Sequence, residues 1–288
     1  MPRPFAYVCA AAVLLACVVA AAPLAGRPRQ DVINYGKIPP VKRKVTLDGV
    51  TLTYDTRLAP AVTAAHAPAM PLQSPTDKPD WFWPAHVVFD LSAAYPAPPP
   101  GFRPEIHVCA VEDFRHAAAA SERWEREVGL RVRDLRRLLR RRPAALTGEI
   151  PTVPFPDGHD AFRAHLKYLR FKGGSGVAYL AQGQQDEDFI SNGRITYEFR
   201  GLTDDGRHYV YASLPVAAPF LPPARAVESH DGYRLPYTFY GPDRAAQLRR
   251  YRNYVARIRR RLERLPPDRF APSLRLLDEA FSSLEINK

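Results

Sequence analysis

Cysteine is scarce in this chain, with three residues among 288. Cys9 and Cys17 lie in an apolar stretch at the N-terminus, so Cys109 is the one thiol in the remainder of the sequence. A single thiol cannot form an internal disulfide, which excludes the class of small secreted domains held together by disulfide bridges. The fold must therefore be stabilised by an apolar core, in which we expect Cys109 to be a small buried residue of a strand.

The sequence also lacks the common motifs of catalysis and cofactor binding. It has no His-Glu-x-x-His zinc motif, no Walker-type phosphate loop and no dinucleotide-binding glycine pattern. The carboxylates at 186–188 lack the spacing and the glycine of an EF-hand loop, and we interpret them as a solvated turn. Gly173-Gly174-Ser175-Gly176-Val177 fails the last position of the Gly-x-Ser-x-Gly turn of hydrolases. We therefore predict no metal site, no cofactor and no catalytic residue.

Acidic residues are fewer than basic residues. Thirty Asp and Glu residues stand against 41 Lys and Arg residues, which gives a formal net charge of +11. Hydrophobic residues make up 46% and charged residues 25% of the chain, a balance typical of a globular protein. Most of the basic residues are arginine, and this excess has two explanations, codon usage and an anionic binding partner. The sequence alone leaves both open.

Residues 1–26 have the pattern of an export signal: one arginine, an almost unbroken apolar run, and then small residues. We favour simple export. Leu14-Leu15-Ala16-Cys17 also resembles the lipobox of bacterial lipoproteins, in which Cys17 would carry the lipid. An uncleaved anchor is the third alternative, because the run approaches the roughly 20 residues that span a bilayer. All three predict an exported protein, periplasmic, cell-surface or secreted, and the last two predict a membrane association through the N-terminus.

The rest of the chain alternates between strand and helix patterns. Residues 27–40 are predicted to be a tether, and 41–288 a single domain. Alternating apolar and polar residues, with turns at Asp48-Gly49 and at Gly206, predict antiparallel strands. The predicted strands lie at 41–55, 85–91, 105–114, 194–202 and 207–216.

Helices are predicted where apolar residues recur at steps of three and four. Residues 114–142 and 243–265 show this pattern, and a short last helix follows. Pro143 and Pro266 should end the two long helices. A short helical start and then a hairpin are predicted for 159–182, with the second strand beginning at Val177. The fold class is therefore α+β, a sandwich with one antiparallel sheet of about six strands and helices packed on it.

One segment carries a specific resemblance. The residues concerned are Lys167, Tyr168, Leu169, Phe171, Gly174, Gly176, Val177, Tyr179 and Leu180, then Tyr197, Phe199, Gly201, Leu202, Thr203, Asp205, Gly206, Tyr209, Val210, Leu214, Pro215 and Val216. They form the pattern KYLxFxxGxGVxYL followed by YxFxGLTxDGxxYVxxxLPV, with His208 in place of the first aromatic of a pair. This pattern is similar to that of an uncharacterised family of bacterial secreted proteins and lipoproteins. A more distant likeness, in element order only, is to PsbP-like α/β/α sandwiches. The resemblance implies export and a fold but no activity.

The two predicted helices are rich in arginine, and they are the one feature of the sequence that points to a partner. The residues predicted to bind are Arg136, Arg140, Arg141, Arg257, Arg260 and Arg261. An arginine-rich face fits an anionic envelope component such as a lipid headgroup, a phosphate polymer or an acidic glycan. Export argues against nucleic acid as the partner. The alternative is that these arginines form ordinary solvated faces, favoured near helix C-termini by the helix dipole.

Two other functions stay open at this point. Trp81 and Trp83, in the stretch DWFWP, either plug the edge of the core or contact another envelope protein, which would make the protein a structural envelope component. The remaining alternative is a secreted hydrolase whose site lies at the 173–177 turn and uses His165 or His208. The first choice is a non-enzymatic binding protein for an anionic partner.

Overall fold

The computed structural model describes residues 39–74, 82–95, 102–153, 158–223, 228–236 and 243–287. They belong to a compact unit that spans Ile33–Lys288. The predicted export signal with Cys17, nearly all of the predicted tether, and Trp81 lie outside the described residues. Within the part of the chain that is described, no helix combines the length and the apolar character needed to cross a membrane.

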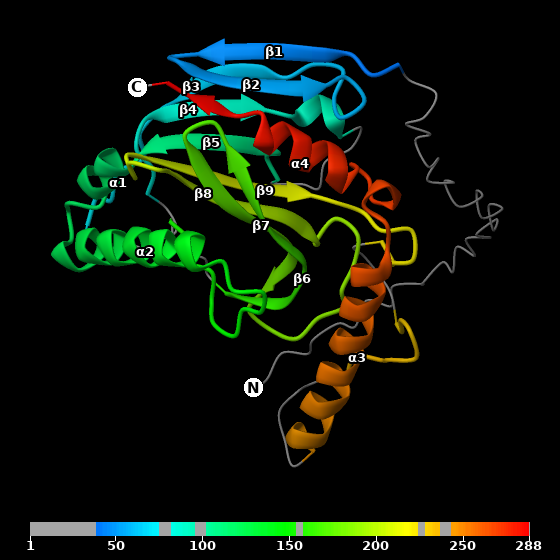
Figure 1. Ribbon diagram of the computed structural model, residues 1–288. Helices are drawn as coiled ribbons and strands as arrows, with labels where there is room; N and C mark the ends of the chain where they lie inside the picture. The colour runs from blue at the N-terminus through cyan, green and yellow to red at the C-terminus, as the bar shows by residue number, and fades with distance from the viewer. Residues whose placement is uncertain are drawn as a thin grey trace, which may run out of the picture. The chain divides into compact units, whose positions relative to one another are not determined.

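The core of the fold is an antiparallel sheet of seven strands in the order β3-β4-β5-β9-β8-β7-β6 (Figure 1). Its strands are β3 (Thr63–Ala67), β4 (His86–Asp90), β5 (Glu105–Ala110), β9 (His208–Pro215), β8 (Thr196–Thr203), β7 (Gly174–Gln184) and β6 (His159–Phe171). A second sheet has the order β1-β2-β10, with β1 (Lys42–Leu47), β2 (Val50–Asp55) and β10 (Glu285–Ile286). The short strand β10 pairs with the first two residues of β2, Val50 and Thr51.

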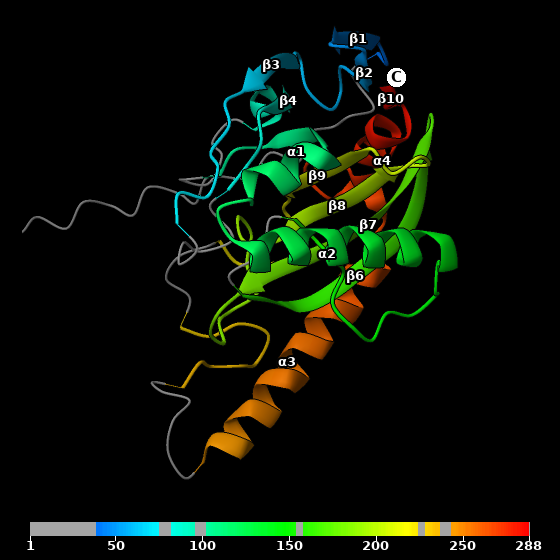
Figure 2. The same ribbon diagram turned by 90° about the vertical axis from the view of Figure 1, so that its left-hand side faces the viewer.

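Four α-helices occur among the described residues: α1 (Val111–Ala117), α2 (Glu122–Arg141), α3 (Arg244–Arg264) and α4 (Leu274–Ser282). Single 3-10 turns lie at Ser92–Ala94 and Pro267–Arg269. The helix α2 crosses one face of the large sheet (Figure 2), where its buried residues share a cluster with Val177, Tyr179 and Tyr209. Helices α3 and α4 pack on the other face, against a cluster that contains Tyr197 and Phe199. Strict alternation along β8 therefore sends neighbouring side chains to two different cores.

Several predictions are confirmed. The chain is α+β with antiparallel sheets, Asp48-Gly49 turns the β1–β2 hairpin, and Pro143 follows the end of α2. Gly206 has a φ of 74° in the β8–β9 turn, a conformation that glycine adopts without a Cβ clash. Cys109 is fully buried in β5. The antiparallel α+β class followed from local pattern, because alternation and helical period are properties of neighbouring residues.

Other predictions are wrong. The single sheet of about six strands is in fact a sheet of seven strands and a separate sheet of three. Residues 159–171, predicted to begin as a helix, form the long edge strand β6, whose pairing with β7 shifts register twice. These shifts interrupt the alternation and give the sequence a false helical period. The predicted helix at 114–142 is two helices, separated at 118–121, and the first of them begins inside the predicted strand 105–114.

Candidate functional site

The six arginines predicted to bind are not brought together by the fold. Arg136, Arg140 and Arg141 lie in the last turns of α2, whereas Arg257, Arg260 and Arg261 lie on α3, across the sheet. Two of the three α3 arginines, Arg257 and Arg261, share one partner. Asp231 accepts hydrogen bonds from Arg257 Nε at 3.2 Å and from Arg261 Nη1 at 2.8 Å, and Arg261 also stacks 4.0 Å above the ring of Phe220. Both arginines thus hold the 228–236 segment against the helix. Arg260 is exposed.

A different combination of arginines does converge. The end of α2 passes over the tip of the β6–β7 hairpin, and Arg136, Arg140 and Arg142 there meet Arg170 of β6 around a hollow of about 420 Å³. Ser175 of β7 also lines this hollow, which we call the arginine groove. Tyr168 of β6 donates a hydrogen bond to the carbonyl of Pro143 at 3.1 Å, and this contact fixes the helix end over the hairpin.

The arginine groove is strongly basic. Of the described residues that line it, Asp204 is the one acid, and its carboxylate lies 3.6 Å from Arg170, with both side chains mostly exposed. Arg136 donates to the backbone carbonyl of Asp205 at 3.4 Å. Arg140 has no ion pair with any residue that the structure describes. Ser175 is buried, and its hydroxyl makes no hydrogen bond with the described residues. Guanidinium groups and a hydroxyl around one hollow are the donor set that phosphate and carboxylate oxygens accept from.

The residues of the predicted hydrolase are placed as follows. Lys172 and Gly173 turn the β6–β7 hairpin, with Gly173 at a φ of 79°, and Gly174 begins β7. The His165 side chain lies on the α3 side of the sheet. Its Nε2 is 2.7 Å from the carbonyl oxygen of Leu262, and its ring lies edge-on to that of Phe270. His208 begins β9. Among the described residues, no hydrogen bond joins Ser175 to either histidine.

Trp83 lies in a cluster of rings on the α2 face of the sheet. Its ring centroid is 5.2 Å from that of His86, 4.8 Å from that of His107 and 5.5 Å from those of Phe114 and Tyr211. It is half-buried and packs against the second core cluster. This placement matches the interpretation of Trp83 as a plug at the edge of the core. Trp81 lies outside the described residues.

The two histidines under Trp83 form a pair, in which His86 is buried and His107 is 15% exposed. His86 Nδ1 is 2.7 Å from the carbonyl of Pro84, so this nitrogen donates, and His86 Nε2 is left to accept from His107 Nδ1 at 2.9 Å. His107 Nε2 then faces the Glu105 carboxyl group at 3.7 Å. Burial, with the nearby His86 and Arg200, lowers the pKa of His107 to about 3, and burial also lowers the pKa of His86. Both rings are therefore neutral in the folded protein at pH 7.

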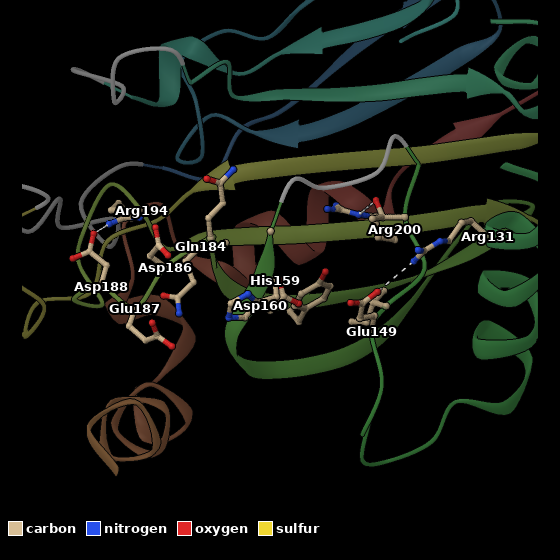
Figure 3. Close-up of a pocket in the computed structure, with 16 residues that line it drawn as sticks. Arg131, Glu149, His159, Asp160, Gln184, Asp186, Glu187, Asp188, Arg194 and Arg200 are labelled. Carbon is tan, nitrogen blue, oxygen red and sulfur yellow. Dashed lines mark hydrogen bonds and ion pairs between the residues drawn. The ribbon is translucent and has the colours of Figure 1, made fainter. Parts of the chain in front are cut away.

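Sequence reasoning missed a second hollow, of about 520 Å³, which we call the polar pocket. Its charged and polar lining comes from β6, β7, β8, the segment after α2, and the loop between β7 and β8. The residues are Arg131, Glu149, Thr152, His159, Asp160, Tyr179, Gln184, Gln185, Asp186, Glu187, Asp188, Arg194 and Arg200. Figure 3 shows His159 and Asp160 in the middle, Asp186, Glu187 and Asp188 toward one end, and Arg131 with Glu149 toward the other. Only the acidic turn at 186–188 stood out in the sequence.

A buried ion pair lies beneath the polar pocket. Arg200 donates from Nη2 to Glu198 Oε2 at 2.5 Å and from Nε to the Thr152 hydroxyl at 2.8 Å, and its guanidinium stacks 4.1 Å from the Tyr211 ring. Burial alone would lower the pKa of Arg200, but the Glu198 carboxylate and the surrounding tyrosines raise it well above its usual range. Arg200 therefore stays charged.

Asp160 is a carboxyl group of the polar pocket with a raised pKa. Burial first, and then the negative charge of Glu198, raise the pKa of Asp160 to about 6, against the opposing effects of Arg163 and Arg200. The Arg163 guanidinium is 3.5 Å away. A carboxylate in this state gains from any additional positive charge that enters the pocket.

No protein-family model, curated protein or solved structure matches this chain. The resemblance carried by residues 167–216 therefore stays a prediction. Among the described residues, no three His, Cys, Asp or Glu side chains are grouped closely enough to hold a metal ion.

Proposed function

We propose that this protein is an exported, non-enzymatic binding protein of the cell envelope, and that it binds an anionic group in the arginine groove. The observation that carries this proposal is the convergence of Arg136, Arg140 and Arg142 with Arg170, from two separate elements, on one hollow. Among the described residues that line it, Asp204 is the single acid. Export rests on the signal pattern of residues 1–26. Two of the arginines chosen from the sequence, Arg136 and Arg140, belong to this group.

The donor set favours an oxyanion over a diffuse negative surface. Guanidinium groups recognise phosphate and carboxylate by paired hydrogen bonds, which gives geometric selectivity as well as charge. Ser175 is nearly buried, and its hydroxyl makes no hydrogen bond with the described residues. This hydroxyl adds a neutral donor at the same hollow. The partner classes that fit are a phosphate-bearing envelope polymer, a lipid headgroup and an acidic glycan, which share the same oxyanion chemistry.

Removing one groove arginine should weaken phosphate binding. We expect the variants Arg140→Gln and Arg170→Gln each to lower the affinity for inorganic polyphosphate about five- to tenfold, because a hydrogen bond to a charged group contributes about 1.5–3 kcal/mol and solvent exposure reduces this. Titration calorimetry at low salt measures the effect. The affinity of the unaltered protein should fall as salt is added, because exposed charges are screened.

The matched control is Arg260→Gln, which removes the same charge from α3 on the opposite face of the sheet. It should change the affinity less than twofold. Equal losses in all three variants would mean that binding follows net charge and not the groove. Vesicles with anionic lipid and a sulfated glycan, tested in parallel, distinguish the three partner classes.

A further inference from the structure

The polar pocket has an unusual charge balance for a chain with a net charge of +11. Each arginine in its lining already has a carboxylate partner: Arg131 has Glu127 and Glu149, Arg194 has Asp188, and Arg200 has Glu198. Asp186 and Glu187 have no ion pair with any residue that the structure describes, and Asp160 has one long contact. The uncompensated charge that faces this pocket is therefore negative.

Tyr179 provides an independent observation. It lines the polar pocket and is 4% exposed, yet its hydroxyl makes no hydrogen bond within the described residues. The buried Tyr209, in the same core cluster, does have partners, the Thr152 hydroxyl and the Val153 amide. A hydroxyl that lines a pocket without a protein partner can still donate one hydrogen bond and accept others from a ligand. In the sheet Tyr179 is directly opposite Glu198, so it shares the desolvated floor with that carboxylate.

We propose that the polar pocket is a binding site for a small organic ammonium ion, with Asp160 and Tyr179 as its principal contacts. A primary ammonium group carries three donors. It can donate to the Asp160 carboxylate and to the Tyr179 hydroxyl, and its charge offsets the repulsion between Asp160 and Glu198. This site is separate from the arginine groove and does not depend on the function proposed for that groove.

The arrangement of the acids favours an elongated amine over a metal ion. Figure 3 shows Asp160 in the middle of the polar pocket and Asp186 and Glu187 toward one end of it. Among the described residues, these carboxylates do not form a group that could coordinate a metal ion. A linear polyamine can instead direct one ammonium group to Asp160 and a second to the acidic loop.

Binding should depend on pH through Asp160. The groups that act on it are Glu198 and Arg200 from β8, Arg163 on its own strand, and Glu149 from the segment after α2, and together with burial they raise its pKa to about 6. At pH 7.5 the carboxylate is ionised, and at pH 5 about nine-tenths of it is protonated. The affinity for an ammonium ligand should therefore fall about tenfold between these two pH values.

The test uses spermidine as the probe, the purified full-length protein, and titration calorimetry at pH 7.5 and pH 5. We expect one strong site at pH 7.5, at least tenfold weaker binding in Asp160→Asn, and about three- to tenfold weaker binding in Tyr179→Phe. Asp160→Asn should fold, because it replaces a carboxylate whose charged form burial disfavours. Its melting temperature at pH 7.5 should equal or exceed that of the parent.

The control Asp48→Asn removes one charge at the exposed β1–β2 turn, where asparagine tolerates the positive φ of 47°. It should leave spermidine affinity unchanged. The second pocket variant, Glu187→Gln, alters the acidic loop and should weaken spermidine binding two- to fivefold. The proposal is overturned if spermidine does not bind, if Asp48→Asn weakens binding as much as Asp160→Asn, or if magnesium chloride at equal ionic strength competes fully with spermidine.

Discussion

Replacing Glu198 with glutamine should lower the free energy of unfolding by about 3–5 kcal/mol. This is the cost of removing one partner of a buried ion pair and leaving the other charge uncompensated. Glu198 and Arg200 lie on the same face of β8, and their side chains are 9% and 6% exposed. The Glu198 carboxylate also accepts hydrogen bonds from the hydroxyls of Thr196 at 2.5 Å and Ser213 at 2.6 Å. Glutamine keeps the shape of this side chain but removes the charge that compensates Arg200.

Arg200 cannot relieve the loss by releasing its proton or by moving to water. It also donates to the carbonyls of Phe199 and Ala212 at 2.9 and 2.7 Å, and the Tyr211 ring covers its guanidinium. Urea unfolding followed by circular dichroism measures the change. The double variant Glu198→Leu with Arg200→Met should cost less than Glu198→Gln alone, because a buried pair replaced by apolar residues leaves no uncompensated charge. A single-variant effect below about 1 kcal/mol would show that water reaches the pair.

Acid should destabilise the protein through the pair of His86 and His107. The pKa of His107 is about 3 in the folded protein, against about 6.5 in an unfolded chain. Because the folded pKa is the lower one, the unfolded chain binds more protons below pH 6.5, so stability is lost as pH falls from 6.5 toward 3. For His107 alone the loss is about 2 kcal/mol at pH 5. His86, whose pKa burial also lowers, acts in the same direction.

The test is the difference in the free energy of unfolding between pH 7 and pH 5, in the parent and in His107→Gln. We expect the variant to be less stable at pH 7, because it loses ring contacts with Trp83 and Tyr211, and its pH-dependent loss should be smaller by about 2 kcal/mol. Glu105, whose pKa burial raises, works in the opposite direction and is present in both proteins.

The control for the histidine pair is His66→Gln, at a side chain that is 61% exposed on β3. It should leave the difference between pH 7 and pH 5 as it is in the parent. A parent-like pH dependence in His107→Gln would show that another group causes the acid sensitivity.

Much of the secondary structure could be predicted because it depends on neighbours in sequence. Alternation placed the β8–β9 hairpin, the Asp48-Gly49 turn placed the β1–β2 hairpin, and the apolar period placed α2 and α3. The strand β6 could not be predicted in this way. Its register shifts and the positive φ of His165 are set by contacts with β7 and with the end of α3, which are remote in sequence.

The sequence by itself determined that the chain is basic, that arginines gather on two helices, and that one thiol lies in a buried strand. Only the tertiary structure decided which charges are available to a ligand. It paired Arg257 and Arg261 with Asp231, brought Arg170 beside the end of α2, and buried Arg200 against Glu198. The physical reason is that composition and period are local, whereas the free energy of a charge depends on the groups that folding places around it.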